Sequence, residues 1–143
     1  MEKISIFILA ILIAFILNIV WEFSHYKLYN DLSGIPATKH LIMASFMDIF
    51  IIFCVFLVVS LKNRNLEWIV RPTFFDYLII IILCLIVAIW IETWALNIGR
   101  WTYKDSMPTI FGLGLSPLVQ LFITGVLALW IVRFFDKFYF LIS

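Results

Sequence analysis

Residues 91–103 read IETWALNIGRWTY and place an acidic side chain inside an apolar run. Glu92 lies near the end of a segment that otherwise has the composition of a membrane-spanning helix. The segment then leaves through Asn97, Gly99 and Arg100 into aromatic residues. A carboxylate in hydrocarbon is costly without a partner, so an intramembrane acid marks a candidate functional site. This stretch predicts a membrane helix that carries a polar site near one end.

The overall composition agrees with a membrane protein. Of the 143 residues, 65% are hydrophobic and 13% are charged, whereas soluble domains are about half apolar and a quarter charged. The net charge of +1 and the absence of a basic run in the sequence exclude nucleic-acid binding. Cys54 and Cys84 fall inside apolar runs, which predicts buried thiols rather than disulfides.

Four apolar runs are long enough to cross the hydrocarbon core as helices, which takes about 20 residues. They cover residues 4–23, 41–61, 74–96 and 115–133. In lipid the backbone must satisfy its own hydrogen bonds, so runs of this kind form helices. The predicted fold is all-α: a single domain over residues 1–143 that forms a four-helix transmembrane bundle, with antiparallel neighbours because the connections are short.

The distribution of basic residues predicts the orientation of this bundle. One side of the membrane carries Lys3, Lys62, Arg64, Arg71, Arg133 and Lys137, and the other carries Lys27, Lys39, Arg100 and Lys104. Basic residues favour the cytoplasmic side. We therefore expect a multi-pass protein of the cell membrane with both termini in the cytoplasm.

Polar residues at helical spacing occur near the outer end of all four predicted helices. They are Asn18, Glu22 and His25 on the first helix, His40 and Asp48 on the second, Glu92 on the third, and Ser116, Gln120 and Thr124 on the fourth. Residues three or four apart share one face of a helix. The pattern predicts a polar pocket in the outer half of the bundle.

The three acids are the candidate catalytic residues of this pocket. Glu22, Asp48 and Glu92 would act as proton donors or acceptors. The candidate ligand-binding residues are Arg100, Gln120, Asn18 and Trp101. Arg100 suits a phosphate or carboxylate head group, and its alternatives are reaching to the membrane interface or pairing with Glu92. Polar groups that only hold the bundle together are the other interpretation.

A metal or haem cofactor is a further hypothesis. Glu22 and His25 form a Glu-x-x-His pair, a spacing that presents two ligands to one ion. With His40, Asp48 or Glu92 added, the donors suit zinc or non-haem iron. His25 and His40 are the only histidines, so at most one bis-histidine haem fits.

Several short motifs resemble a known group of proteins. They are Trp21-Glu22, Leu28-Tyr29, Gly99-Arg100-Trp101-x-Tyr103, Met107-Pro108 and Gly114-Leu115-Ser116-Pro117-Leu118-Val119-Gln120. Together they resemble a group of small uncharacterised prokaryotic membrane proteins with four helices. The resemblance implies the same topology and brings no activity with it.

The sequence leaves three classes of function open. The first is a small membrane enzyme or binding protein whose pocket takes a lipid-like or small anionic ligand. The second is a subunit of a homo-oligomeric transporter or channel, although residues deeper than Asp48 offer almost no polar path. The third is a non-catalytic subunit of a larger membrane complex. Whether the protein is an enzyme stays open.

The metal hypothesis predicts near-stoichiometric zinc or iron in protein purified without a chelator and without a histidine tag. His25→Ala or Glu22→Gln should then lower the metal content per chain, measured by elemental mass spectrometry. Metal-free protein would contradict the hypothesis and favour acid–base chemistry beside Arg100.

Overall fold

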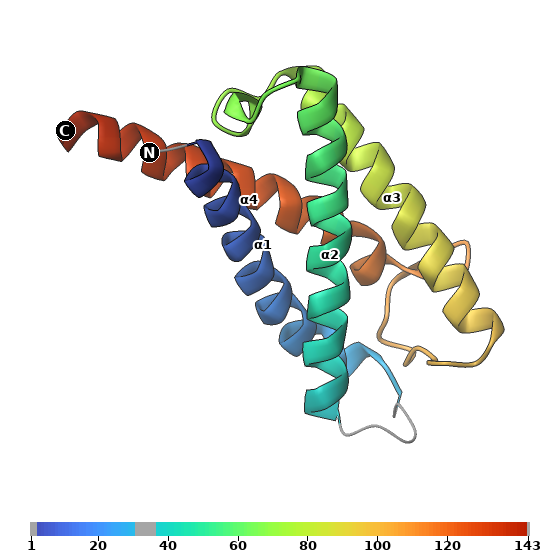
Figure 1. Cartoon of the computed structure of the whole chain (residues 1–143). Coiled ribbons are helices and arrows are strands. Elements are labelled where there is room, and N and C mark those ends of the chain that lie inside the picture. The colour runs from blue at the N-terminus through green and yellow to red at the C-terminus, as the bar shows by residue number, and fades with distance from the viewer. Residues whose placement is uncertain (1–2, 31–36, 143) are drawn as a thin grey trace.

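The computed structural model describes residues 3–30 and 37–142, which form four long helices (Figure 1). The helices are α1 (Lys3–His25), α2 (Ala37–Asn63), α3 (Phe74–Asn97) and α4 (Leu115–Ile142). Short 3-10 helices follow α1 and α2, at η1 (Tyr26–Leu28) and η2 (Glu67–Ile69). A small antiparallel pair, β1 (Thr109–Ile110) and β2 (Leu113–Gly114), precedes α4.

All four long helices are long and apolar enough to cross a membrane, which confirms the predicted fold class. Their outward faces expose large apolar side chains, such as Ile8, Leu12 and Ile16 on α1. In a bilayer these faces contact lipid chains, which cover apolar surface that would otherwise be exposed to water. Cys84 is buried as predicted, whereas Cys54 is exposed on the outer face of α2.

The last helix is longer than predicted. The sequence prediction ends it at Arg133, but α4 continues to Ile142. Residues 134–142 contain no glycine or proline, so nothing in the local sequence ends the helix. In Figure 1 this final part of α4 extends past the other helices.

The helices pack around an apolar core, and two of them separate at one end. α1 packs on α2 and α4, and α3 packs mainly on α4. Figure 1 shows the end of α2 close to the start of α3, and the start of α2 wide apart from the end of α3. The core is filled by apolar side chains such as Ile52, Phe56 and Ile80. The separation leaves room between α2 and α3 at the end that carries the polar residues.

Hydrogen bonds to one carboxylate hold the closed end of the bundle. Asp76, which is fully buried, accepts hydrogen bonds from Lys62 Nζ at 2.7 Å and Asn63 Nδ2 at 2.8 Å. It also forms a capping box with Thr73, the N-cap residue of α3. One side chain therefore joins the end of α2 to the start of α3.

At the open end, the segment after α3 turns back onto α1. Gly99 has φ +65, and the N–H groups of Gly99 and Arg100 donate to the carbonyls of Leu96 and Ala95. This is a Schellman motif, which ends a helix and reverses the chain. Tyr29 then forms an isolated β-bridge with Tyr103. The reversal brings residues 100–103 beside the end of α1.

We expect Asp76→Ala to lower the free energy of unfolding by about 1–3 kcal/mol, because it removes half of the capping box of α3 and the buried acceptor that Lys62 and Asn63 share. The measurement is the unfolding midpoint of the purified protein in detergent. Glu67→Gln is the control, since the Lys3–Glu67 ion pair of 2.7 Å is exposed to solvent. Equal losses in both variants would show that Asp76 has no special role.

Candidate functional site

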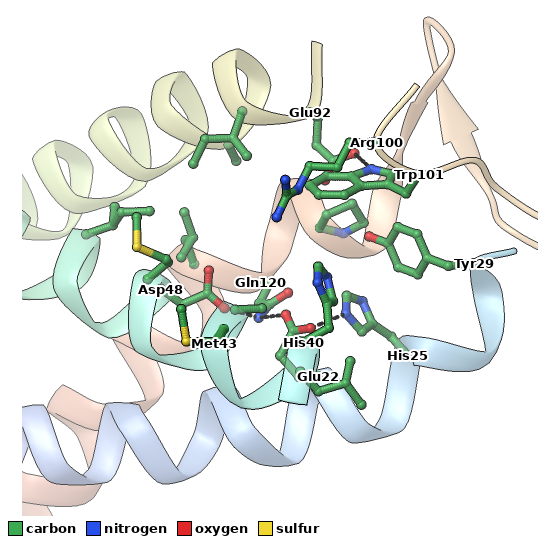
Figure 2. A pocket seen from close by; sticks show the side chains of 18 of the residues that line it. Glu22, His25, Tyr29, His40, Met43, Asp48, Glu92, Arg100, Trp101 and Gln120 are labelled. Atoms are coloured by element: carbon green, nitrogen blue, oxygen red, sulfur yellow. Dashed lines mark hydrogen bonds and ion pairs between the residues drawn. The ribbon is translucent and has the colours of Figure 1, made fainter. Parts of the chain in front are cut away.

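A cavity of about 560 Å³ lies where α2 and α3 separate (Figure 2). Its polar lining residues come from all four helices and from the chain that follows α1 and α3: Glu22, His25, Tyr26, Tyr29, His40, Asp48, Glu92, Arg100, Trp101 and Gln120. Apolar side chains such as Met43, Met47 and Ile51 complete the wall on α2. The cavity therefore combines a polar interior with apolar walls.

Gln120 links the acids on α1 and α2. Its Nε2 lies 2.7 Å from Glu22 Oε1 and 2.7 Å from Asp48 Oδ2. Because both oxygens contact the same nitrogen, the two carboxyl groups are close neighbours. The same nitrogen lies 3.2 Å from Asn18 Oδ1, although an amide nitrogen has only two hydrogens to donate. Asn18 is fully buried behind the cavity and reaches its lining through Gln120.

Glu92 is held by two neutral donors from the segment after α3. Trp101 Nε1 lies 3.3 Å from Glu92 Oε2, and the Tyr103 hydroxyl donates to the same oxygen. Gly114 makes this possible, since a Cβ there would lie 3.0 Å from the Tyr103 ring. Among the described residues no carboxylate pairs with Arg100. Arg100 therefore does not pair with Glu92, which was one of its predicted alternatives.

Two tyrosines that were not among the predicted site residues, Tyr29 and Tyr103, lie beside the acids. Burial, together with the negative charge of Glu92, raises the pKa of the Tyr29 phenol. Burial and the hydrogen bond to Glu92 raise the pKa of Tyr103 in the same way. Both phenols therefore stay protonated, and the Tyr103 hydroxyl donates to Glu92. Tyr103 ends the stretch 91–103, but its spacing from Glu92 gave no reason to pair them.

His25 makes one polar contact within its own helix and one with α4. Its Nε2 lies 3.4 Å from Glu22 Oε2, and its Nδ1 lies 2.7 Å from Ser116 Oγ. The Trp21 Nε1 group donates to the same serine oxygen at 3.2 Å. The His40 ring meets the Trp101 ring edge-on, with centroids 6.4 Å apart. Figure 2 shows both histidines pointing toward the cavity.

The predicted zinc or iron site has no support in this geometry. Within residues 3–30 and 37–142, no three His, Cys, Asp or Glu side chains gather closely enough to hold a metal ion. Glu22 and His25 are neighbours, as their spacing predicts. The other predicted ligands bond elsewhere: Asp48 to Gln120, and Glu92 to Trp101 and Tyr103.

Fold and site together define a membrane-type four-helix protein with a buried polar cluster at one end. In searches with the whole chain, no protein-family model, no curated protein and no solved structure matched it. Its function must therefore be argued from the site itself.

We expect Gln120→Ala to lower the free energy of unfolding by about 1–3 kcal/mol, since it leaves Glu22 and Asp48 without their shared donor. The measurement is the unfolding midpoint of the purified variant in detergent. Ser45→Ala is the matched control, because Ser45 is buried but its hydroxyl donates only to the Leu41 carbonyl of its own helix. Adding Asp48→Asn to Gln120→Ala should recover part of the loss. If it recovers nothing, the carboxylate of Asp48 does not depend on Gln120.

Proposed function

We propose that this protein binds the polar end of an anionic, amphipathic molecule in the cavity between α2 and α3. The observation that carries the proposal is the position of Arg100. Its side chain is exposed, it lines the cavity, and no ion pair among the described residues involves it. Figure 2 shows the guanidinium group pointing into the space beside Asp48 and Gln120.

The chemistry of Arg100 selects the head group. A guanidinium is planar and always charged, and it binds phosphate or carboxylate through two parallel hydrogen bonds. His40 lines the same part of the cavity, at the start of α2, and adds an imidazole donor. Arg100 comes shortly after Asn97, the last residue of α3, so the anion would lie at the level of the membrane interface.

The walls of the cavity suit an apolar chain below that head group. The α2 lining runs from His40 to Ile51, which is about 16 Å along a helix at 1.5 Å per residue. Met43 and Met47 on α2 and Trp94 on α3 line the cavity and are also exposed on the outside of the bundle. An apolar chain could therefore pass between α2 and α3 into the bilayer.

The acids then lie beside the middle of the ligand. We propose that Glu22, Asp48 and Glu92 accept hydrogen bonds from hydroxyl or amide groups of the ligand, or exchange protons with it. Acid–base chemistry at these residues would make the protein an enzyme, and ligand binding alone would not require it. Catalysis by these three acids stays a prediction.

The wider setting is also proposed from the sequence. The basic residues favour a cell-membrane protein with cytoplasmic termini, so the cavity would open on the outer side. A homo-oligomeric transporter is the weaker alternative, because the core beyond Asp48 consists of apolar residues such as Ile52, Phe56 and Ile80. Assembly with itself or with a larger complex stays a prediction.

The test is binding of hexadecyl phosphate to the purified protein, measured by native mass spectrometry from a neutral detergent. We expect Arg100→Gln to weaken binding by about tenfold or more, the loss expected for one charge-assisted hydrogen-bonded pair. Lys104→Gln removes a cation from the same loop but outside the cavity, and it should change binding little. Hexadecanol, which lacks the anion, should bind weakly to all three proteins.

A second variant tests the cavity without touching charge. Ala44 lines the cavity on α2, and Ala44→Trp should fill the space and abolish binding. Equal losses in Arg100→Gln and Lys104→Gln, with no loss in Ala44→Trp, would mean that hexadecyl phosphate binds the surface by charge alone. That result would refute the proposal.

A further inference from the structure

A second pocket, the α1/α4 groove, lies between α1 and α4. The main cavity between α2 and α3 lies on the other side of α1. The groove encloses about 540 Å³ and is lined by Leu17, Val20, Trp21, Ser24, His25, Lys27, Leu28, Ser116, Thr124 and Leu127. Among the described residues His25 is the only one that lines both this groove and the main cavity. The imidazole therefore separates two spaces, with Glu22 on one side and Ser116 on the other.

The hydrogen bonds around Ser116 fix the direction of each donor. An indole N–H can only donate, so Ser116 Oγ accepts from Trp21 at 3.2 Å. The serine hydrogen is then free to point to His25 Nδ1, which lies 2.7 Å away. With Nδ1 as the acceptor, the neutral imidazole carries its hydrogen on Nε2, which faces Glu22 Oε2 at 3.4 Å.

The acid at the end of this chain is itself held in place. Glu22 Oε1 accepts a hydrogen bond from Gln120 Nε2 at 2.7 Å, which leaves Oε2 for His25. Glu22 and His25 are each only 8% exposed, so water competes little for these contacts. A nucleophile within hydrogen-bond reach of a base, and a base oriented by a third group, is the arrangement that activates a serine.

We propose that Ser116, His25 and Glu22 form a nucleophile, a general base and a positioning acid that cleave an ester of an amphipathic molecule lying in the α1/α4 groove. The site takes a different ligand from the anion site at Arg100, although Glu22 and His25 also line the main cavity. It goes beyond the proposed function, and either can fail without the other. Sequence motifs do not reveal it, because Ser116 follows His25 by 91 positions and belongs to another helix.

The reaction balances with water as the only co-reactant. Ser116 Oγ attacks the ester carbonyl while its proton passes to His25 Nδ1. Collapse of the tetrahedral intermediate breaks the bond to the alcohol, which takes that proton and leaves. Water then attacks the acyl-serine with His25 as the base, so a carboxylic acid is released and the free serine is restored. The 3.4 Å contact to Glu22 should shorten when the imidazole becomes positively charged.

The groove indicates the class of ester. Leu17, Val20 and Leu127 give it an apolar wall that suits an acyl chain, and Lys27 adds a cation near the end of α1. Ser116 lies in the first turn of α4. Leu115 N–H there donates to the Pro108 carbonyl and Pro117 has no N–H, which leaves the N–H groups of Ser116 and Leu118 without a partner within the helix. Those groups and the Trp21 indole can donate to the oxygen that becomes negative during attack. An acyl ester of an anionic amphiphile fits these features.

The test uses a fluorophosphonate with a long alkyl chain, which forms a bond from serine oxygen to phosphorus and releases fluoride. We expect wild-type protein in detergent to be labelled at Ser116, identified by peptide mass spectrometry. Ser116→Ala should abolish the label, and His25→Gln should slow labelling by about a hundredfold or more, which is within the range for losing a general base. Ser24→Ala is the control, because Ser24 lines the same groove but bonds to the Val20 carbonyl.

Two variants at Glu22 separate positioning from folding. Glu22→Gln should slow labelling, and Glu22→Asp should restore part of the rate, with unfolding midpoints measured for both. Absence of label on the wild-type protein, or label on any serine other than Ser116, overturns the proposal. Neither outcome affects binding of hexadecyl phosphate at Arg100, so the two proposals are tested independently.

Discussion

The structure depends on the need to satisfy three carboxyl groups inside an apolar helix bundle. Each acid finds a donor outside its own helix. Glu22 and Asp48 share the amide of Gln120 on α4, and Glu92 accepts from the segment that follows α3. Leaving any of them without a donor in hydrocarbon would cost more than most apolar contacts contribute. The polar groups therefore fix which faces of the helices meet.

The two ends of the bundle satisfy their buried carboxyl groups in different ways. At the closed end a single buried carboxylate, Asp76, is surrounded by donors from Lys62, Asn63 and Thr73, so α2 and α3 are held together. At the open end no comparable bond joins α2 directly to α3 in the described part of the chain. Gln120 joins α4 to Asp48 on α2 instead, and the cavity lies between α2 and α3. Among the described residues, side-chain hydrogen bonds join α2 directly to α3 only at Asp76, so the bundle is closed at that end and open at the other.

The network also gives each acid a distinct environment. Glu92 accepts from two aromatic donors, whereas Glu22 lies between an amide and an imidazole. His25 connects the second of these environments to a groove on the opposite side of α1. One buried histidine thus lines both the main cavity and the α1/α4 groove.

The sequence by itself determined the membrane character, the four helices and the end of the bundle where polar residues gather, because apolar length and helical periodicity are local properties. It also singled out Glu22, Asp48, Glu92, Arg100 and Gln120. Only the tertiary structure decided which of these touch, that α4 continues beyond Arg133, and that Glu92 bonds to Tyr103 instead of Arg100. The contact between Ser116 and His25 likewise could not be predicted from the sequence. Contacts across helices depend on rotation, depth and the return path of a loop, and no periodicity along one chain segment encodes them.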